Sequence, residues 1–169
     1  RMKTRALIAF VALSGCAPEA KPPEAPAIVE QVAPDIIPPA TVSDAAKYKP
    51  APVGEITVAA PLAGARATSP LVAEGVAINN WFFEGQFVAE LVVEGEAITM
   101  APAMQSGDKS WTDPGPVEFK AELAFEVTRE TPAELILSED MPEMINPDTD
   151  ERGPARSVRI PVVLIPPAK

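Results

Sequence analysis

The stretch VEFKAELAFEV, residues 117–127, alternates between apolar and polar side chains. The apolar positions are Val117, Phe119, Ala121, Leu123, Phe125 and Val127, and the charged positions between them are Glu118, Lys120, Glu122 and Glu126. A period of two places these sets on opposite faces of a β-strand, and it cannot form the stripe of an amphipathic helix. We therefore predict a strand with one face in a core and the other in water.

Similar runs occur on both sides of this strand, separated by Gly, Pro, Asn and Asp. They predict strands at residues 55–59, 71–78, 82–93, 97–101, 133–138 and 157–165. Gly75, Gly85 and Gly95 indicate bulges or turns. Pro161 indicates an edge position or a bulge in the last strand, because proline cannot donate a ladder hydrogen bond. About seven short strands without a long helical pattern predict an all-β fold, a single antiparallel immunoglobulin-like β-sandwich over residues 54–166.

The order of short segments across this region is a second observation. The segments are residues 56–58, 61–64, 69–71, 74–77, 83–87, 111, 119, 123–125, 133–137 and 160–164. Together they resemble the immunoglobulin-like domain of bacterial spore germination, the second of the families associated with the GerMN domain. The resemblance covers residues 55–165 and implies a β-sandwich in envelope proteins, often lipoproteins, with a structural or binding role and no established catalytic residues. No GerMN domain is recognisable in this sequence, so the resemblance implies nothing about sporulation.

The N-terminal residues predict export and lipidation. Three basic residues and an apolar run, residues 6–13, precede Cys16, the only cysteine of the chain. This order is typical of a bacterial signal peptide, here residues 1–15, and the run is much shorter than the roughly 20 residues that cross a bilayer. Leu-Ser-Gly-Cys at residues 13–16 resembles the lipobox of bacterial lipoproteins, which implies acylation of Cys16 after cleavage before it. Several acyl chains would hold the protein stably on a membrane.

The residues after Cys16 predict a spacer. Residues 16–53 are dominated by proline, alanine and glutamate, a composition that does not form a packed core. Proline stiffens such a segment toward an extended conformation. Because Ala17 rather than an aspartate follows the anchor, we expect the outer membrane if the cell has two membranes. The predicted localisation is thus the bacterial cell envelope, and the expected partners are the membrane and another envelope protein or cell-wall component.

Composition excludes several classes of function. The formal net charge is -10 at pH 7, and no basic patch is visible, which argues against binding of nucleic acid. The chain has no histidine, so histidine-dependent triads and histidine-ligated zinc are excluded. Most carboxylates fall at outward positions of predicted strands. We therefore predict a noncatalytic protein without a cofactor.

Metal binding is the alternative that the sequence leaves open. Asp148 and Asp150 before a glycine resemble the opening of a calcium loop, although Arg152 occupies the next ligand position. Thioether pairs at Met100 with Met104, and at Met141 with Met144, are ligands that Cu(I) prefers. The competing interpretations are a solvated hairpin loop for the aspartates and ordinary packing for the methionines.

Three consecutive aromatic residues, Trp81, Phe82 and Phe83, are candidates for partner binding. They could form an exposed platform for a sugar or a protein, or they could pack in the core and anchor a strand end. Strand alternation places Phe82 opposite its two neighbours, so we expect the three rings to divide between the core and the surface.

Overall fold

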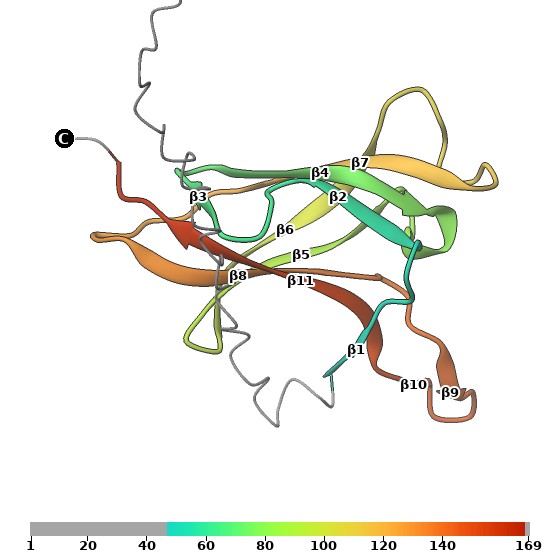
Figure 1. Ribbon diagram of the computed structural model, residues 1–169. Coiled ribbons are helices and arrows are strands. Elements are labelled where there is room, and N and C mark those ends of the chain that lie inside the picture. Colours follow the sequence, from blue (N-terminus) through green and yellow to red (C-terminus); the bar gives the residue numbers. More distant parts are fainter. Residues whose placement is uncertain (1–46, 168–169) are drawn as a thin grey trace, which may run out of the picture. The chain divides into compact units, whose positions relative to one another are not determined.

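The computed structural model describes residues 47–167, and more than half of this part of the chain is β-strand, with almost no helix (Figure 1). The strands are β1 (Tyr48–Pro50), β2 (Ile56–Ala60), β3 (Ala65–Ala67), β4 (Leu71–Ile78), β5 (Gln86–Val93), β6 (Glu96–Ser106), β7 (Pro116–Leu123), β8 (Thr131–Ser138), β9 (Met144–Asn146), β10 (Glu151–Arg152) and β11 (Ala155–Leu164). One 3₁₀ turn, Asn79–Trp81, precedes β5. The predicted all-β class is confirmed. Each predicted strand has a counterpart, and β1, β3, β9 and β10 are short additions.

Nine strands form one curled sheet in the order β1-β11-β8-β5-β6-β7-β4-β2, with β3 also paired to β11. The pairings are antiparallel except those of β1 and β3, which run parallel to β11. β9 and β10 form a separate hairpin. β2 pairs with β4 at one end of the sheet, whereas β3 follows it in the chain and pairs at the other end. The chain therefore connects the two ends of the sheet where they curl toward each other (Figure 1).

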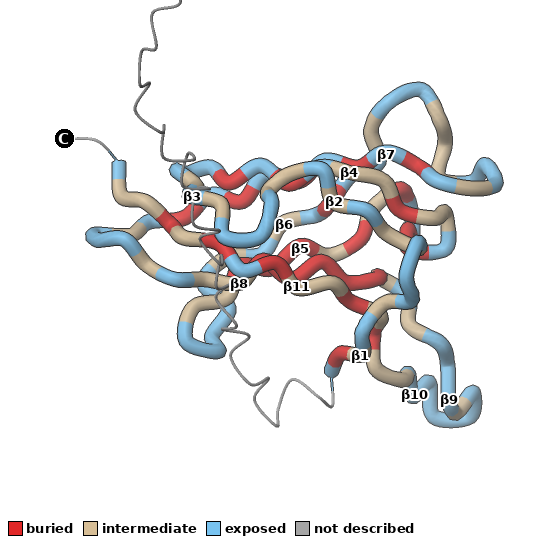
Figure 2. Tube along the Cα trace, viewed as in Figure 1, coloured by how far each residue is buried: buried red, intermediate tan, exposed pale blue. Residues whose placement is uncertain are grey.

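The core lies between the two curled halves of the sheet, where buried residues of both halves face each other (Figure 2). The odd positions of β7 confirm the predicted alternation, because each of its four apolar side chains is at most 2% exposed. Phe87 of β5 lies at the centre of an aromatic cluster. Its ring contacts Trp81, Phe82 and Phe119 edge-on, at centroid distances of 5.6, 5.1 and 4.9 Å. Such edge-to-face pairs stabilise a core beyond their burial alone.

The last strand also follows its prediction. Ile160, Val162 and Leu164 of β11 are buried in the core. Pro161 lies between the residues that pair with β1 and those that pair with β3, and its carbonyl accepts a hydrogen bond from the Gly64 backbone N–H at 2.7 Å. The proline is tolerated because no long strand pairs along this side of β11.

Two of the three predicted glycine positions lie in turns, and the third lies where two strands come close together. Glu84-Gly85 and Glu94-Gly95 both have positive φ, as in the two-residue turns that suit hairpins. Gly75 of β4 lies opposite a bulge in β2, where the backbones come close together.

One predicted boundary needs correction. The spacer was expected to extend over residues 16–53, but Tyr48–Pro50 forms β1 on the edge of β11, and Tyr48 is 8% exposed. The fold therefore includes Tyr48–Pro50, which the prediction assigned to the spacer. The predicted signal peptide, Cys16 and the rest of the spacer lie outside the described residues. Within residues 47–167 no helix is long and apolar enough to span a membrane.

Candidate functional site

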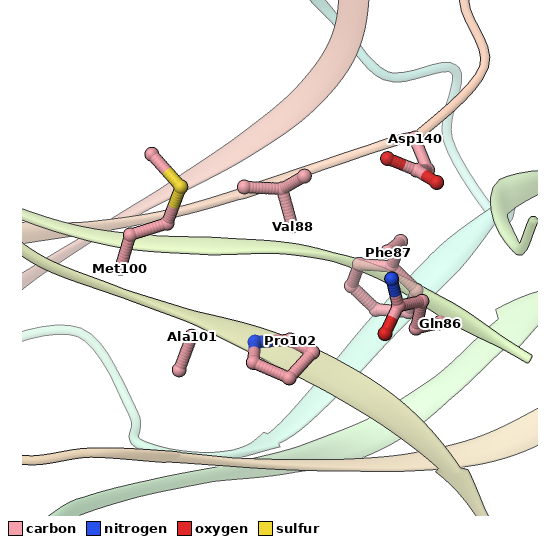
Figure 3. A pocket seen from close by; sticks show the side chains of 7 residues that line it. All are labelled: Gln86, Phe87, Val88, Met100, Ala101, Pro102 and Asp140. Atoms are coloured by element: carbon pink, nitrogen blue, oxygen red, sulfur yellow. The ribbon is translucent and has the colours of Figure 1, made fainter.

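The outer face of β5 and β6 exposes apolar side chains beside a shallow depression. Met100 and Met104 of β6 are 61% and 45% exposed, and Pro102 lies between them on the same face. The depression has a volume of about 310 Å³, and we call it the outer hollow. It is lined by Gln86, Phe87, Val88, Met100, Ala101, Pro102 and Asp140 (Figure 3).

Asp140 gives the outer hollow its charge. It follows the end of β8, and Figure 3 shows it at the opposite end of the hollow from Met100, with Val88 between them. Burial, together with the nearby charge of Glu84, raises the pKa of the Asp140 carboxyl. No basic side chain of residues 47–167 forms an ion pair with it. An apolar floor with a poorly solvated carboxylate at one end is suited to an apolar group that carries a positive charge.

A buried polar network lies on the same outer face. Glu90 of β5 is 4% exposed and accepts hydrogen bonds from the Tyr48 hydroxyl and the Lys47 ammonium, both at 2.7 Å. The Tyr48 ring packs on Ile136 and Ala155. The Lys47 ammonium and the Arg159 guanidinium lie 4.7 and 5.5 Å from the centre of this ring. Burial raises the pKa of Tyr48. Burial alone would lower the pKa of Lys47, but the contacts with Glu90 and Tyr48 outweigh it and raise the pKa.

A second network of hydrogen bonds and ion pairs connects Arg156 with Glu139, Glu55 and, through Glu55, the buried Trp81. Arg156, at the start of β11, donates from Nε to Glu139 at 2.7 Å and from Nη1 to Glu55 at 2.5 Å. The backbone N–H of Arg156 also donates to Glu139, and the Trp81 indole donates to Glu55 at 3.1 Å. The hydrogen bond to Glu139, together with the charges of Glu139 and Glu55, raises the pKa of Arg156 against the effect of burial. Every charged group here has partners, which is typical of a structural role.

The predicted aromatic candidates do not lie together at the surface. Trp81 is 0% exposed and Phe82 is 5% exposed, whereas Phe83 is 40% exposed. The 3₁₀ turn that ends at Trp81 interrupts the strand alternation, so two adjacent rings enter the core. Phe83 alone among the three faces solvent.

The metal candidates are spread over two surfaces. Asp148 and Asp150 are exposed in the β9–β10 hairpin, and the Asp148 N–H donates to the Asn146 side chain. Within residues 47–167, no group of three or more Asp, Glu, His or Cys side chains could hold a metal ion. Met100 and Met104 are four positions apart on one strand, about 13 Å between Cα atoms, so sharing an ion requires both side chains to bend together along the strand. Met141 and Met144 are 40% and 41% exposed in the segment after β8. Metal binding stays a prediction.

The structure also reveals residues that the sequence did not single out. Glu90 lies in a predicted strand and Asp140 in the acidic segment after another, and only the fold brings them against apolar groups. The one available signal was Tyr48, the only tyrosine in the chain, at the end of a proline-rich segment.

No protein-family model, no curated protein and no solved structure matches the chain.

Proposed function

We propose that residues 47–167 form an immunoglobulin-like sandwich that serves as a noncatalytic binding or scaffold module. Strand order supports the fold. β2-β4-β7-β6 corresponds to the A-B-E-D order of one immunoglobulin sheet, and β5-β8-β11 corresponds to the C-F-G order of the other. The resemblance to the spore-germination immunoglobulin-like domain agrees with this arrangement. It remains part of the proposal, because no family model matches the chain.

The outer hollow is the observation that carries the binding role. It combines exposed thioethers, an apolar floor and the Asp140 carboxylate, whose pKa is raised by burial and by Glu84. Shifted pKa values and exposed apolar groups are both enriched at binding sites. The fully partnered networks around Glu90 and Arg156, in contrast, are suited to holding the domain together.

We further propose that the module is held on the bacterial envelope by acylated Cys16. The support is the basic, apolar and small-residue order of residues 1–15, followed by Leu-Ser-Gly-Cys. The proline-rich residues between Cys16 and β1 would then act as a spacer between lipid and module. Mass spectrometry of the mature N-terminus should find Cys16 acylated, and a free thiol at Cys16 would contradict this part of the proposal.

The binding role is tested by crosslinking in cells that carry the lipid-anchored protein. A photo-crosslinking amino acid replaces Met104, which is 45% exposed beside the outer hollow. The matched control places the same amino acid at Thr57, which is exposed on β2, three strands away from β6 in the sheet. We expect a discrete crosslinked product from position 104 and none from position 57. Equal or absent crosslinking at both positions would refute binding through this face.

A further inference from the structure

β6 has an open side next to the outer face. It pairs with β5 from Glu96 to Met104, with one irregularity in the register, but only Met104, Gln105 and Ser106 pair with β7. No strand within residues 47–167 pairs with the β7 side of residues 96–103. Residues 96–103, the first eight of the eleven residues of β6, therefore form a free edge within the described part of the sheet.

A second depression lies between this free edge and the segment that follows β7. It has a volume of about 490 Å³ and is lined by Ser69, Ile98, Ala124, Phe125 and Glu126. We call it the edge hollow. Ile98 belongs to β6, and residues 124–126 directly follow β7. The hollow thus offers apolar side chains beside unpaired backbone.

The direction of the free backbone groups follows from the ladder. The Gln105 N–H donates to the Gly85 carbonyl, on the β5 side. Because successive residues of a strand point their N–H and C=O groups to opposite sides, Met100 and Pro102 point theirs away from β5. Proline at position 102 agrees with this, since its missing N–H removes no bond to β5. The Met100 N–H and the carbonyls of Met100 and Pro102 therefore face the open side.

This edge lacks most of the protection that exposed edges usually carry. Residues 97–104 contain no charged side chain, and Ile98 and Met100 are 44% and 61% exposed. Natural edge strands are normally short, charged or covered, because an uncharged edge pairs with other chains. Pro102 removes one donor and leaves the Met100 N–H available.

The charge of the surroundings selects among possible occupants. Glu126 lines the edge hollow, Glu94 and Glu96 flank the start of β6, and nearby Lys120 already pairs with Glu122 at 2.8 Å. Residues 47–167 carry 9 basic and 19 acidic side chains, a net charge of -10, so a second copy would be repelled. Residues 17–46 carry one basic and five acidic side chains, so the chain's own spacer also lacks the complementary charge.

We propose that the free edge of β6 accepts an extended, basic segment of a partner protein as an added strand. This inference rests on the proposed binding function and specifies its partner. Backbone hydrogen bonds to Met100 and Pro102 would provide the pairing, and the edge hollow would take an apolar side chain. Lysine or arginine residues of the segment would meet Glu96 and Glu126.

Synthetic peptides test the charge and the geometry together. The probe is a fluorescent peptide of sequence KVTVKVTVK, and its matched control is EVTVEVTVE. Binding to the full chain in mild detergent is followed by fluorescence anisotropy. We expect the basic peptide to bind about tenfold or more tightly than the acidic one, and to slow hydrogen exchange at the Met100 amide.

Two variants locate the contact. Met100→Lys should weaken binding of the basic peptide about tenfold, whereas Met144→Lys, the same change at another exposed methionine, on β9, should alter it less than about twofold. Glu126→Gln should weaken binding about threefold, with Glu151→Gln in the β9–β10 hairpin as its control. Circular dichroism confirms that each variant is folded.

Three outcomes would overturn the inference. They are equal binding of the two peptides, equal effects of the Met100 and Met144 variants, and a dimer that Met100→Lys dissociates, which would make a second copy the occupant. If position 104 forms a crosslinked product but the basic peptide does not bind, strand addition is refuted and the proposed binding module is retained. If position 104 also forms no crosslinked product, the proposed binding function is refuted as well.

Discussion

Replacing Tyr48 with phenylalanine should destabilise the folded domain by about 2 kcal/mol. The change removes the hydroxyl that donates to Glu90 at 2.7 Å and leaves the ring in place against Ile136 and Ala155. Glu90 is 4% exposed, so water cannot easily replace the lost donor, although Lys47 still donates to the other carboxylate oxygen. Hydrogen bonds to charged groups contribute about 1.5–3 kcal/mol, and this range sets the expected loss.

Urea unfolding followed by tryptophan fluorescence measures this loss, because both Trp81 and Trp111 remain. The midpoint should fall while the slope with urea stays constant, since the surface exposed on unfolding hardly changes. Glu90→Gln and the double variant complete a mutant cycle, and the two changes together should cost less than their sum by about 1 kcal/mol. A loss below about 0.5 kcal/mol, or strict additivity, would contradict a hydrogen bond from the Tyr48 hydroxyl to Glu90.

Four further predictions concern stability. Arg156→Leu should lower the free energy of unfolding in urea by about 3 kcal/mol, because it leaves the Glu139 carboxylate, 4% exposed, without its cation. Adding Glu139→Gln should restore part of this free energy. Gly75→Ala should lower the free energy of unfolding by about 1–3 kcal/mol or more, since the new Cβ would lie 2.1 Å from the Thr57 carbonyl oxygen. Gly153→Ala is the control, and it should lower the free energy of unfolding less in the same assay, because its new Cβ would have its nearest neighbour at 3.3 Å. Asp140→Asn should raise the urea midpoint at neutral pH, because a pKa raised in the folded state means that the charged carboxylate disfavours folding above its unfolded pKa; an unchanged or lower midpoint would refute this. The pKa values of Tyr48 and Lys47 are raised in the folded protein above their ordinary values of 10.0 and 10.5. The stability that these groups contribute is therefore present below the ordinary pKa values and is lost as the pH rises through the pKa values of the folded state. Between about pH 8 and about pH 11 the urea midpoint should consequently fall less in Tyr48→Phe than in the parent.

The long strands could be predicted from sequence because each buries one face. In β7 and β11 the alternation of apolar and polar residues follows directly from the two sides of the sheet. β1 and β3 could not be predicted in this way. Each has three residues and is held by backbone pairing to the edge of β11, which places little demand on side-chain pattern. Tyr48-Lys-Pro consequently looked like the end of a spacer.

The candidate site was harder to predict because distant segments build it. Asp140 follows β8, while Val88 and Met100 come from β5 and β6, so only the sheet order brings them to one hollow. Strand alternation placed Trp81 and Phe82 on opposite faces, but both are buried. The reason is local, because the 3₁₀ turn that ends at Trp81 interrupts the alternation. The free edge of β6 was equally hidden, because it depends on where β7 stops pairing with it.

The distribution of charge connects stability with binding in this domain. Lys47 and Arg156 each pair with a carboxylate that is at most 5% exposed, so these basic groups neutralise the interior. The surface keeps an excess of acidic groups, and their mutual repulsion lowers the stability of the compact state. A basic partner would relieve this repulsion when it binds, and salt would screen the same attraction over about 10 Å at 0.1 M. Association through the β6 edge should therefore weaken as salt rises, whereas the buried pairs around Glu90 and Glu139 should respond much less.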